Sequence, residues 1–142
     1  RRMQGRYVFS QNDTNRAYRD ARCIFHADSI AMGDYGPNCH GTSHEGPFYG
    51  GRHTGEYYLH TPPYQIPYGV MLPNEVGNLV VPVACSSTQV GFCALRYEPI
   101  WFGLGQAAGL AVAQSAKSGK ALADLEIKKL QNTLPVSYTH LT

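Results

Sequence analysis

Charge of either sign is scarce in this 142-residue chain, which carries 12 basic and 10 acidic residues. A net charge of +2 excludes the dense basic stripe of a nucleic-acid-binding protein. The same weak balance gives no basis for attraction to an anionic membrane surface. We therefore expect neither nucleic acid nor membrane among the partners of this protein.

Cysteine pairs of the C-x-x-C type are also lacking. The four cysteines stand at positions 23, 39, 85 and 93, too irregularly for a zinc ribbon or a thioredoxin-type redox site. We expect free thiols and no metal site. Long apolar runs are limited to one, which starts at Ile100, and its Gly and Gln content argues against a membrane span.

The stretch from Asn78 to Ala116 organises the rest of the chain. Its first residues, Asn78–Val83, form a short β-branched run that predicts a buried strand. A loop of small and polar residues, 84–89, follows. Pro99 then suits the first turn of a helix, where its missing N–H costs nothing.

The predicted helix over 100–116 has large apolar residues first and Gly and Ala thereafter. So little side chain on any face predicts a buried helix that backbone or a ligand approaches closely. The N–H groups at its N-terminus would point back toward the loop after the strand. That arrangement favours an electron-rich or anionic cofactor.

The flanking segments are less regular. Residues 33–63 hold four of the six His and many Gly and Tyr, which is typical of loops that build a site. Residues 64–72 predict an edge strand restricted by Pro67, 6–10 a short strand, and 11–22 a helix capped by Asp13 or Thr14. An amphipathic helix is predicted over 124–134, whereas 135–142 resembles translated adapter sequence. We expect that tail to be non-native and the chain to be the C-terminal part of a larger protein.

Four motifs at fixed spacing carry a family resemblance. IPYGVMLP, NLVVPV, ALRYEP and GLGQAAG occur between residues 66 and 109, and DSIAMGDYGPNCHGT lies upstream. Together they resemble the FAD-dependent oxidoreductase family related to the flavin-binding subunit of heterodisulfide reductase. The resemblance implies a glutathione-reductase-type FAD fold, of class α/β (α+β as a fragment). Residues 1–72 would belong to a β-rich substrate domain, and 73–134 would return to a Rossmann-like FAD-binding domain as strand, loop and helix.

The resemblance also implies a cofactor site for FAD. The helix N-terminus would face the pyrimidine edge of the flavin, where its N–H groups stabilise the charge of the reduced ring by about 0.3–1 kcal/mol. Ala84 stands where relatives often place an acidic residue on the ribityl chain. The cofactor-binding residues that we expect are Ala84, Arg96, Tyr97, Glu98, Pro99 and Gln106.

Catalytic and substrate-binding residues follow from the same comparison. Arg96 would neutralise the reduced flavin or hold an anionic substrate, with Glu98 as a possible ion-pair partner. Gln89 stands where the family often has His, which leaves His40 as the candidate for acid–base chemistry beside the ring. We expect Gln89 and Tyr68 to contact a small-molecule substrate.

Simpler interpretations compete with each of these. Arg96 and Glu98 could do no more than pair with each other. The Gly103, Gly105 and Gly109 spacing resembles a dinucleotide fingerprint but lacks its strand-to-helix turn. Two other functions stay open: a flavin electron-transfer subunit with an iron–sulfur partner, and a non-enzymatic glycan-binding module.

Overall fold

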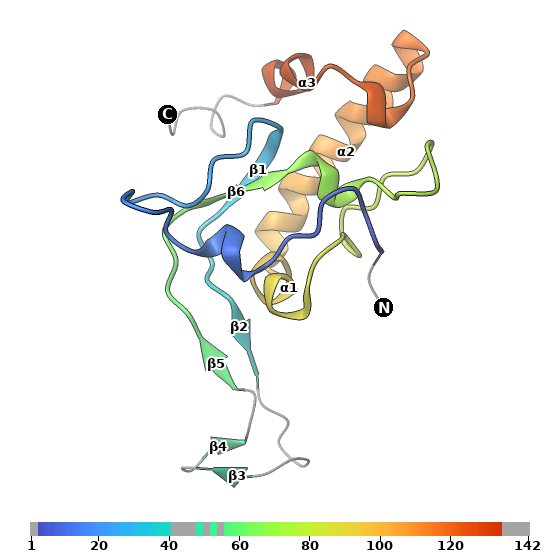
Figure 1. The fold of residues 1–142 in the computed structure, drawn as a ribbon. Helices are drawn as coiled ribbons and strands as arrows, with labels where there is room; N and C mark the ends of the chain where they lie inside the picture. Colours follow the sequence, from blue (N-terminus) through green and yellow to red (C-terminus); the bar gives the residue numbers. More distant parts are fainter. Residues whose placement is uncertain (1–2, 41–47, 50–51, 54–55, 135–142) are drawn as a thin grey trace.

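The computed structural model describes residues 3–40, 48–49, 52–53 and 56–134 (Figure 1). The described chain is of mixed α/β class, with three α-helices and small antiparallel sheets. The α-helices are α1 (Gln89–Leu95), α2 (Glu98–Ser118) and α3 (Ile127–Thr133). Short 3-10 helices are η1 (Gln11–Thr14), η2 (Tyr68–Met71) and η3 (Leu122–Asp124). The strands are β1 (Ser29–Gly33), β2 (Asn38–Cys39), β3 (Phe48–Tyr49), β4 (Arg52–His53), β5 (Tyr57–Tyr58) and β6 (Tyr64–Pro67).

The strands pair in three antiparallel ladders. β1 pairs with β6 from Gly33 opposite Tyr64 to Ser29 opposite Pro67, with an irregular register near Ser29. β2 pairs with β5, and β3 with β4. In Figure 1 the β1–β6 pair crosses beside α2, whereas β2 and β5 run away from it as an arm. The arm starts close to α1, against which β2 packs.

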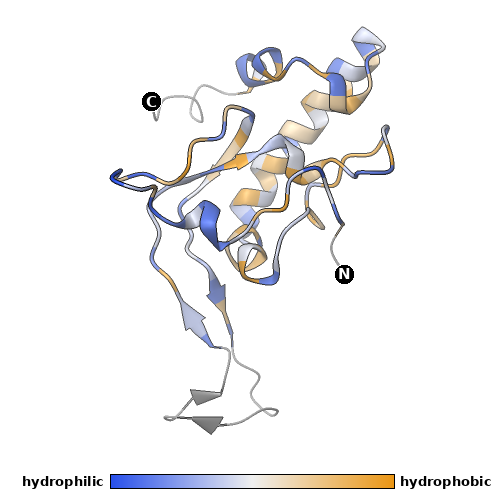
Figure 2. Ribbon diagram, in the orientation of Figure 1, coloured by the Kyte–Doolittle hydropathy of each residue, from blue (hydrophilic) through white to orange (hydrophobic). Residues whose placement is uncertain are grey.

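The core lies between the β1–β6 pair and one face of α2. Figure 2 shows hydrophobic residues along these three elements and hydrophilic ones on β2 and β5. Fully buried side chains come from both halves of the chain: Phe9, Tyr64, Ile66, Val70, Leu95, Leu104 and Leu130. The boundary at 72/73 between substrate and FAD domains stays a prediction, since described residues on both sides share this core. The tail 135–142 lies outside the described residues.

The long helix predicted from the sequence is confirmed. α2 begins at Glu98, with Pro99 in its first turn, and ends before Gly119, which adopts a left-handed conformation with φ 68°. Glycine is the usual residue there because it has no Cβ to clash. The helix over 124–134 is confirmed as the shorter α3, and the strand over 64–72 forms only as β6 before the chain turns into η2.

The predicted burial of α2 on all faces is wrong for the described residues. Ile100, Leu104, Ala107 and Ala111 are buried, yet Phe102 on the opposite face is 75 % exposed. A Cβ on Gly105 or Gly109 would meet nothing within 4 Å. The small residues therefore leave a smooth, exposed strip along the helix.

The predicted central strand Asn78–Val83 is wrong. These residues are irregular, and Leu79 and Val83 are each 46 % exposed. A backbone hydrogen bond from Val81 N to Met71 O, at 2.9 Å, ties the segment to the end of η2. A β-branched run forms a strand only beside a pairing partner, and no described strand lies next to this one.

Two N-terminal predictions are also wrong. Residues 6–10 make one isolated bridge, between Phe9 and Ser87, and not a strand. The helix predicted over 11–22 stops after one turn, η1, and its cap is Ser10, with Asp13 at the third helical position. Ser10 and Asp13 form a capping box, in which each side chain accepts from the other's backbone N–H.

Helix α1 was not predicted from the sequence. Thr88 caps it by accepting a hydrogen bond from Gly91 N at 3.0 Å. The chain can pass here only because Gly91 lacks a side chain: a Cβ would lie 2.4 Å from Phe9 O. α1 therefore packs tightly on the N-terminal segment, and this contact fixes where the helix delivers Arg96.

Candidate functional site

The corner between α1 and α2 is where the predicted cofactor residues meet. Arg96 is the C-cap of α1 and Tyr97 the N-cap of α2, so one peptide links the two helices. Tyr97, Glu98 and Pro99 are exposed, and no side chain caps the N-terminus of α2. An uncapped and exposed helix N-terminus keeps N–H groups available to an electron-rich ligand.

Arg96 ties this corner to strand β2. Its Nη2 and Nε donate to Asn38 O at 3.0 and 3.3 Å. The ion pairs among the described residues do not include Arg96 with Glu98, so their predicted pairing is not formed. His40 is exposed and directly follows β2, two residues beyond the carbonyl that Arg96 holds.

An aromatic cluster flanks the same corner. The ring of Tyr97 stacks on Tyr35 with centroids 4.7 Å apart and planes 16° apart. Tyr58 meets Tyr35 edge-on at 6.1 Å, and His60 meets Tyr58 at 5.0 Å. Stacked and edge-on rings hold one another in place, so these side chains form a fixed aromatic wall beside the N-terminus of α2.

The remaining predicted site residues lie elsewhere. Ala84 is exposed in the loop, and its carbonyl accepts from Met3 N at 3.0 Å. Gln89 is exposed at the first turn of α1, and Gln106 is exposed on α2, eight residues after Glu98. At about 1.5 Å per residue, Gln106 is roughly 12 Å along the helix from its N-terminus.

Tyr68, predicted to contact substrate, lies in the core. Its side chain is 3 % exposed and its hydroxyl donates to Leu122 O at 3.1 Å. Burial raises the pKa of Tyr68 to about 12 because the phenolate would lose its hydration. In this position the residue packs η2 against η3.

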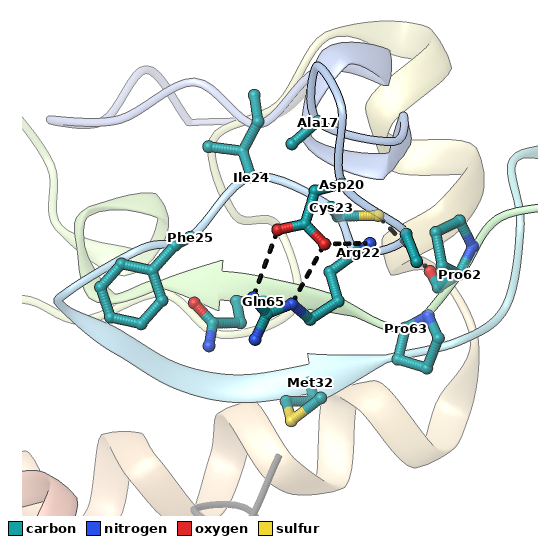
Figure 3. A pocket seen from close by; sticks show the side chains of 11 residues that line it. Ala17, Asp20, Arg22, Cys23, Ile24, Phe25, Met32, Pro62, Pro63 and Gln65 are labelled. Atoms are coloured by element: carbon teal, nitrogen blue, oxygen red, sulfur yellow. Dashed lines mark hydrogen bonds and ion pairs between the residues drawn. The ribbon is translucent and has the colours of Figure 1, made fainter. Parts of the chain in front are cut away.

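A cavity of about 500 Å³ lies between residues 17–25 and the β1–β6 pair, which contributes Met32 and Gln65 to its lining. Figure 3 shows Ile24, Phe25, Met32 and Gln65 around it, with the Arg22–Asp20 ion pair among the lining side chains. Arg22 Nη2 lies 3.2 Å from Asp20 Oδ2. None of the predicted site residues lines this cavity, and no spacing in the sequence signals it, because its walls come from segments that are distant in the chain.

A buried polar cluster near η1 was likewise missed. Asp13 accepts hydrogen bonds from Tyr7 Oη, from Ser10 N at 2.7 Å, and from Ser10 Oγ at 3.1 Å. His26 Nε2 lies 3.0 Å from Asp13 Oδ1, and the His26 ring meets Tyr7 edge-on. Burial alone would raise the pKa of Asp13, but hydrogen bonds from His26, Tyr7 and Ser10 outweigh it and lower that pKa. Burial and the neighbouring carboxylate raise the pKa of Tyr7.

Metal and membrane features are not found in the described part of the chain. It contains no group of three or more His, Cys, Asp or Glu side chains placed to hold a metal ion. No described helix combines the length and the apolar character needed to cross a bilayer.

A protein-family model identifies the class of this protein. The model for FAD-dependent oxidoreductases matches residues 1–134. The chain belongs to the FAD-dependent oxidoreductase family, and its cofactor is FAD. No curated protein and no solved structure matches the chain.

The residues at the α1–α2 corner fit one edge of a flavin. The exposed N-terminus of α2 offers backbone donors, and Arg96 supplies a positive charge one residue before Tyr97. The indole Nε1 of Trp101, in the first turn, is buried with no acceptor among the described residues. Glu98 is the one negative charge in this turn.

Proposed function

We propose that this protein is an FAD-dependent oxidoreductase that oxidises or reduces a small organic substrate through the flavin. The proposal includes the finer resemblance, a glutathione-reductase-type FAD fold related to the flavin-binding subunit of heterodisulfide reductase. The observation that carries it is the α1–α2 corner, where an uncapped helix N-terminus and Arg96 lie together in a chain of this family.

Residues of this corner have distinct roles in the proposal. FAD, when bound, supplies the two-electron chemistry. The backbone at Tyr97 and Glu98 would hold the pyrimidine edge, with Pro99 contributing no N–H. The Arg96 guanidinium, fixed by Asn38 O at 3.0 Å, would offset the negative charge of the reduced ring. Its position is set before the cofactor binds, so little side-chain entropy is lost.

The substrate side of the site is proposed on the aromatic wall. Tyr35, Tyr58 and Tyr97 present rings that a planar or apolar substrate could stack against. His40, which directly follows β2, would supply a proton donor or acceptor to the substrate. If an electron-transfer partner exists, we propose that it exchanges electrons with this same flavin.

Substitution of Arg96 tests the proposal. In the full-length protein, Arg96→Ala should lower the two-electron flavin potential, because the reduced ring loses a neighbouring positive charge. A loss of about 1 kcal/mol corresponds to roughly 20 mV. Arg16→Ala, which removes an exposed Arg far along the chain, is the matched control and should leave the potential unchanged. Equal potentials for both variants would remove Arg96 from the site.

Absorbance and metal content separate the competing functions. The purified full-length protein should be yellow, with the absorption bands of an oxidised flavin, and should contain no iron. A colourless protein that binds glycans would overturn the assignment as a flavoenzyme. Stoichiometric iron would favour the electron-transfer subunit instead.

A further inference from the structure

The cavity between residues 17–25 and the β1–β6 pair has a floor of two neighbouring side chains. Met32 on β1 is paired with Gln65 on β6, so the two side chains lie next to each other on one face of the ladder. Both line the cavity, whose volume is about 500 Å³. Small-molecule sites usually measure roughly 300–1,000 Å³. None of the residues 96–99 at the α1–α2 corner belongs to the lining.

The wall formed by residues 17–25 is held in place by hydrogen bonds. Ala17 N donates to Arg22 O at 2.8 Å, which closes a turn in this segment. The thiol of Cys23 donates to Pro62 O at 3.5 Å and fastens the wall to the residues before β6. The cavity is therefore formed before a ligand binds, and little free energy is spent on ordering it.

The amide of Gln65 offers a hydrogen-bond donor to the cavity. Its Oε1 accepts from His26 N at 2.7 Å, which fixes the orientation of the amide. Among the described residues, no acceptor takes a hydrogen bond from Gln65 Nε2. These N–H groups are thus available to an acceptor atom of a ligand, such as a carbonyl oxygen.

The charges at the cavity neutralise each other. Arg22 and Asp20 are the charged residues of its lining. Arg22 Nε and Nη2 donate to Asp20 Oδ1 and Oδ2 at 3.3 and 3.2 Å. A charged ligand would have to break this pair to gain a partner, whereas an uncharged ligand would not. Apart from Gln65 and the Cys23 thiol, the other lining residues are apolar.

We propose that this cavity binds an uncharged, planar aromatic molecule that carries a carbonyl group. The ligand ring lies against Phe25, which is 74 % exposed and which a bound ring would remove from water. Beneath the ring is Met32, whose thioether makes favourable contacts with aromatic rings. The carbonyl oxygen accepts from Gln65 Nε2. Figure 3 shows Phe25 at one end of the cavity and Pro62 and Pro63 at the other, with Gln65 between them.

Three naphthalene compounds of similar size test the class of ligand. 2-Acetylnaphthalene carries the carbonyl, 2-ethylnaphthalene lacks it, and 2-naphthoate has a carboxylate in its place. Each is titrated into the full-length protein with FAD bound, and binding is followed by saturation-transfer NMR of the ligand. We expect the ketone to bind about tenfold more tightly than the hydrocarbon, which is the effect of one hydrogen bond, and the carboxylate to bind most weakly. Any other order of affinities would overturn the proposal.

Variants of the lining test where the ketone binds. Gln65→Glu keeps an oxygen for His26 N but has no amide N–H, so it should abolish the preference for the ketone over the hydrocarbon. Phe25→Ala should weaken binding of the ketone about threefold to tenfold. Phe102→Ala is the matched control, because it removes a ring that is 75 % exposed and lies outside the lining. It should bind the ketone as the wild type does.

Circular dichroism shows whether each variant is folded. If Gln65→Glu does not fold, the phenylalanine variants still decide the question, since both rings are exposed. A preference for the ketone that persists in folded Gln65→Glu would overturn the proposal. So would equal affinities of Phe25→Ala and Phe102→Ala for the ketone.

Discussion

Replacing Asp13 with asparagine perturbs the most connected buried polar group in the described chain. The Asp13 side chain is 2 % exposed and accepts from Tyr7, from the backbone and hydroxyl of Ser10, and contacts His26. Asparagine has nearly the same shape but one oxygen in place of two. Its amide N–H₂ would point at groups that are themselves donors.

The structure sets the expected magnitude. A hydrogen bond to a charged group contributes about 1.5–3 kcal/mol, and breaking a buried charged contact by removing one partner costs roughly 3–5 kcal/mol. We therefore expect Asp13→Asn to lower the free energy of unfolding by about 3–5 kcal/mol. That is a large part of the ~5–15 kcal/mol that stabilises an ordinary domain. The loss should loosen η1 and with it the N-terminal segment that packs on α1.

Urea unfolding followed by circular dichroism measures this effect at pH 7. The matched control is Asp20→Asn, which breaks an exposed ion pair with Arg22 and should change stability far less. Hydrogen bonds hold the folded-state pKa of Asp13 below its ordinary value of 3.8. Its contribution is thus present above pH 3.8 and is lost as the pH falls through the folded-state pKa. A loss no greater than that of Asp20→Asn, or a difference that persists in acid, would refute the reasoning.

Further expectations concern the helices and the predicted substrate residue. Gly91→Ala places a Cβ 2.4 Å from a carbonyl oxygen and should destabilise by about 1–3 kcal/mol in urea unfolding. The Cβ of Gly109→Ala meets nothing within 4 Å, so this variant should stabilise the protein by about 0.5–1 kcal/mol. If both glycine variants changed the free energy of unfolding in the same direction, the packing described here would be contradicted. Tyr68→Phe loses one buried hydrogen bond and should cost about 1 kcal/mol of stability without changing KM. A raised KM would instead indicate that Tyr68 contacts the substrate.

Local signals in the sequence predicted some elements well. Helix α2 followed from Pro99 and the apolar and small residues after it, since helix starts are marked by neighbouring residues. α3 followed from its amphipathic period in the same way. The strand predicted over Asn78–Val83 is absent because a strand depends on a partner that composition alone cannot supply. Helix α1 was missed because it is only seven residues long, too short for its apolar residues to show a helical period.

In the candidate site, too, neighbours in sequence were predictable and contacts between distant segments were not. The clustering of Arg96, Tyr97, Glu98 and Pro99 was predictable because these residues are consecutive. Their neighbours were not: the carbonyl that Arg96 holds belongs to a residue 58 positions earlier. Nor does any spacing place the ring of Tyr35 on Tyr97.

The sequence by itself determined the family, the cofactor and the course of the longest helix, since each depends on residues close together in the chain. Only the tertiary structure decided which face of α2 is covered and that β2 lies against α1. It likewise decided that the Arg96 guanidinium donates to the carbonyl of Asn38. Contacts of this kind arise from packing between distant segments, where burial, excluded volume and hydrogen-bond satisfaction act together.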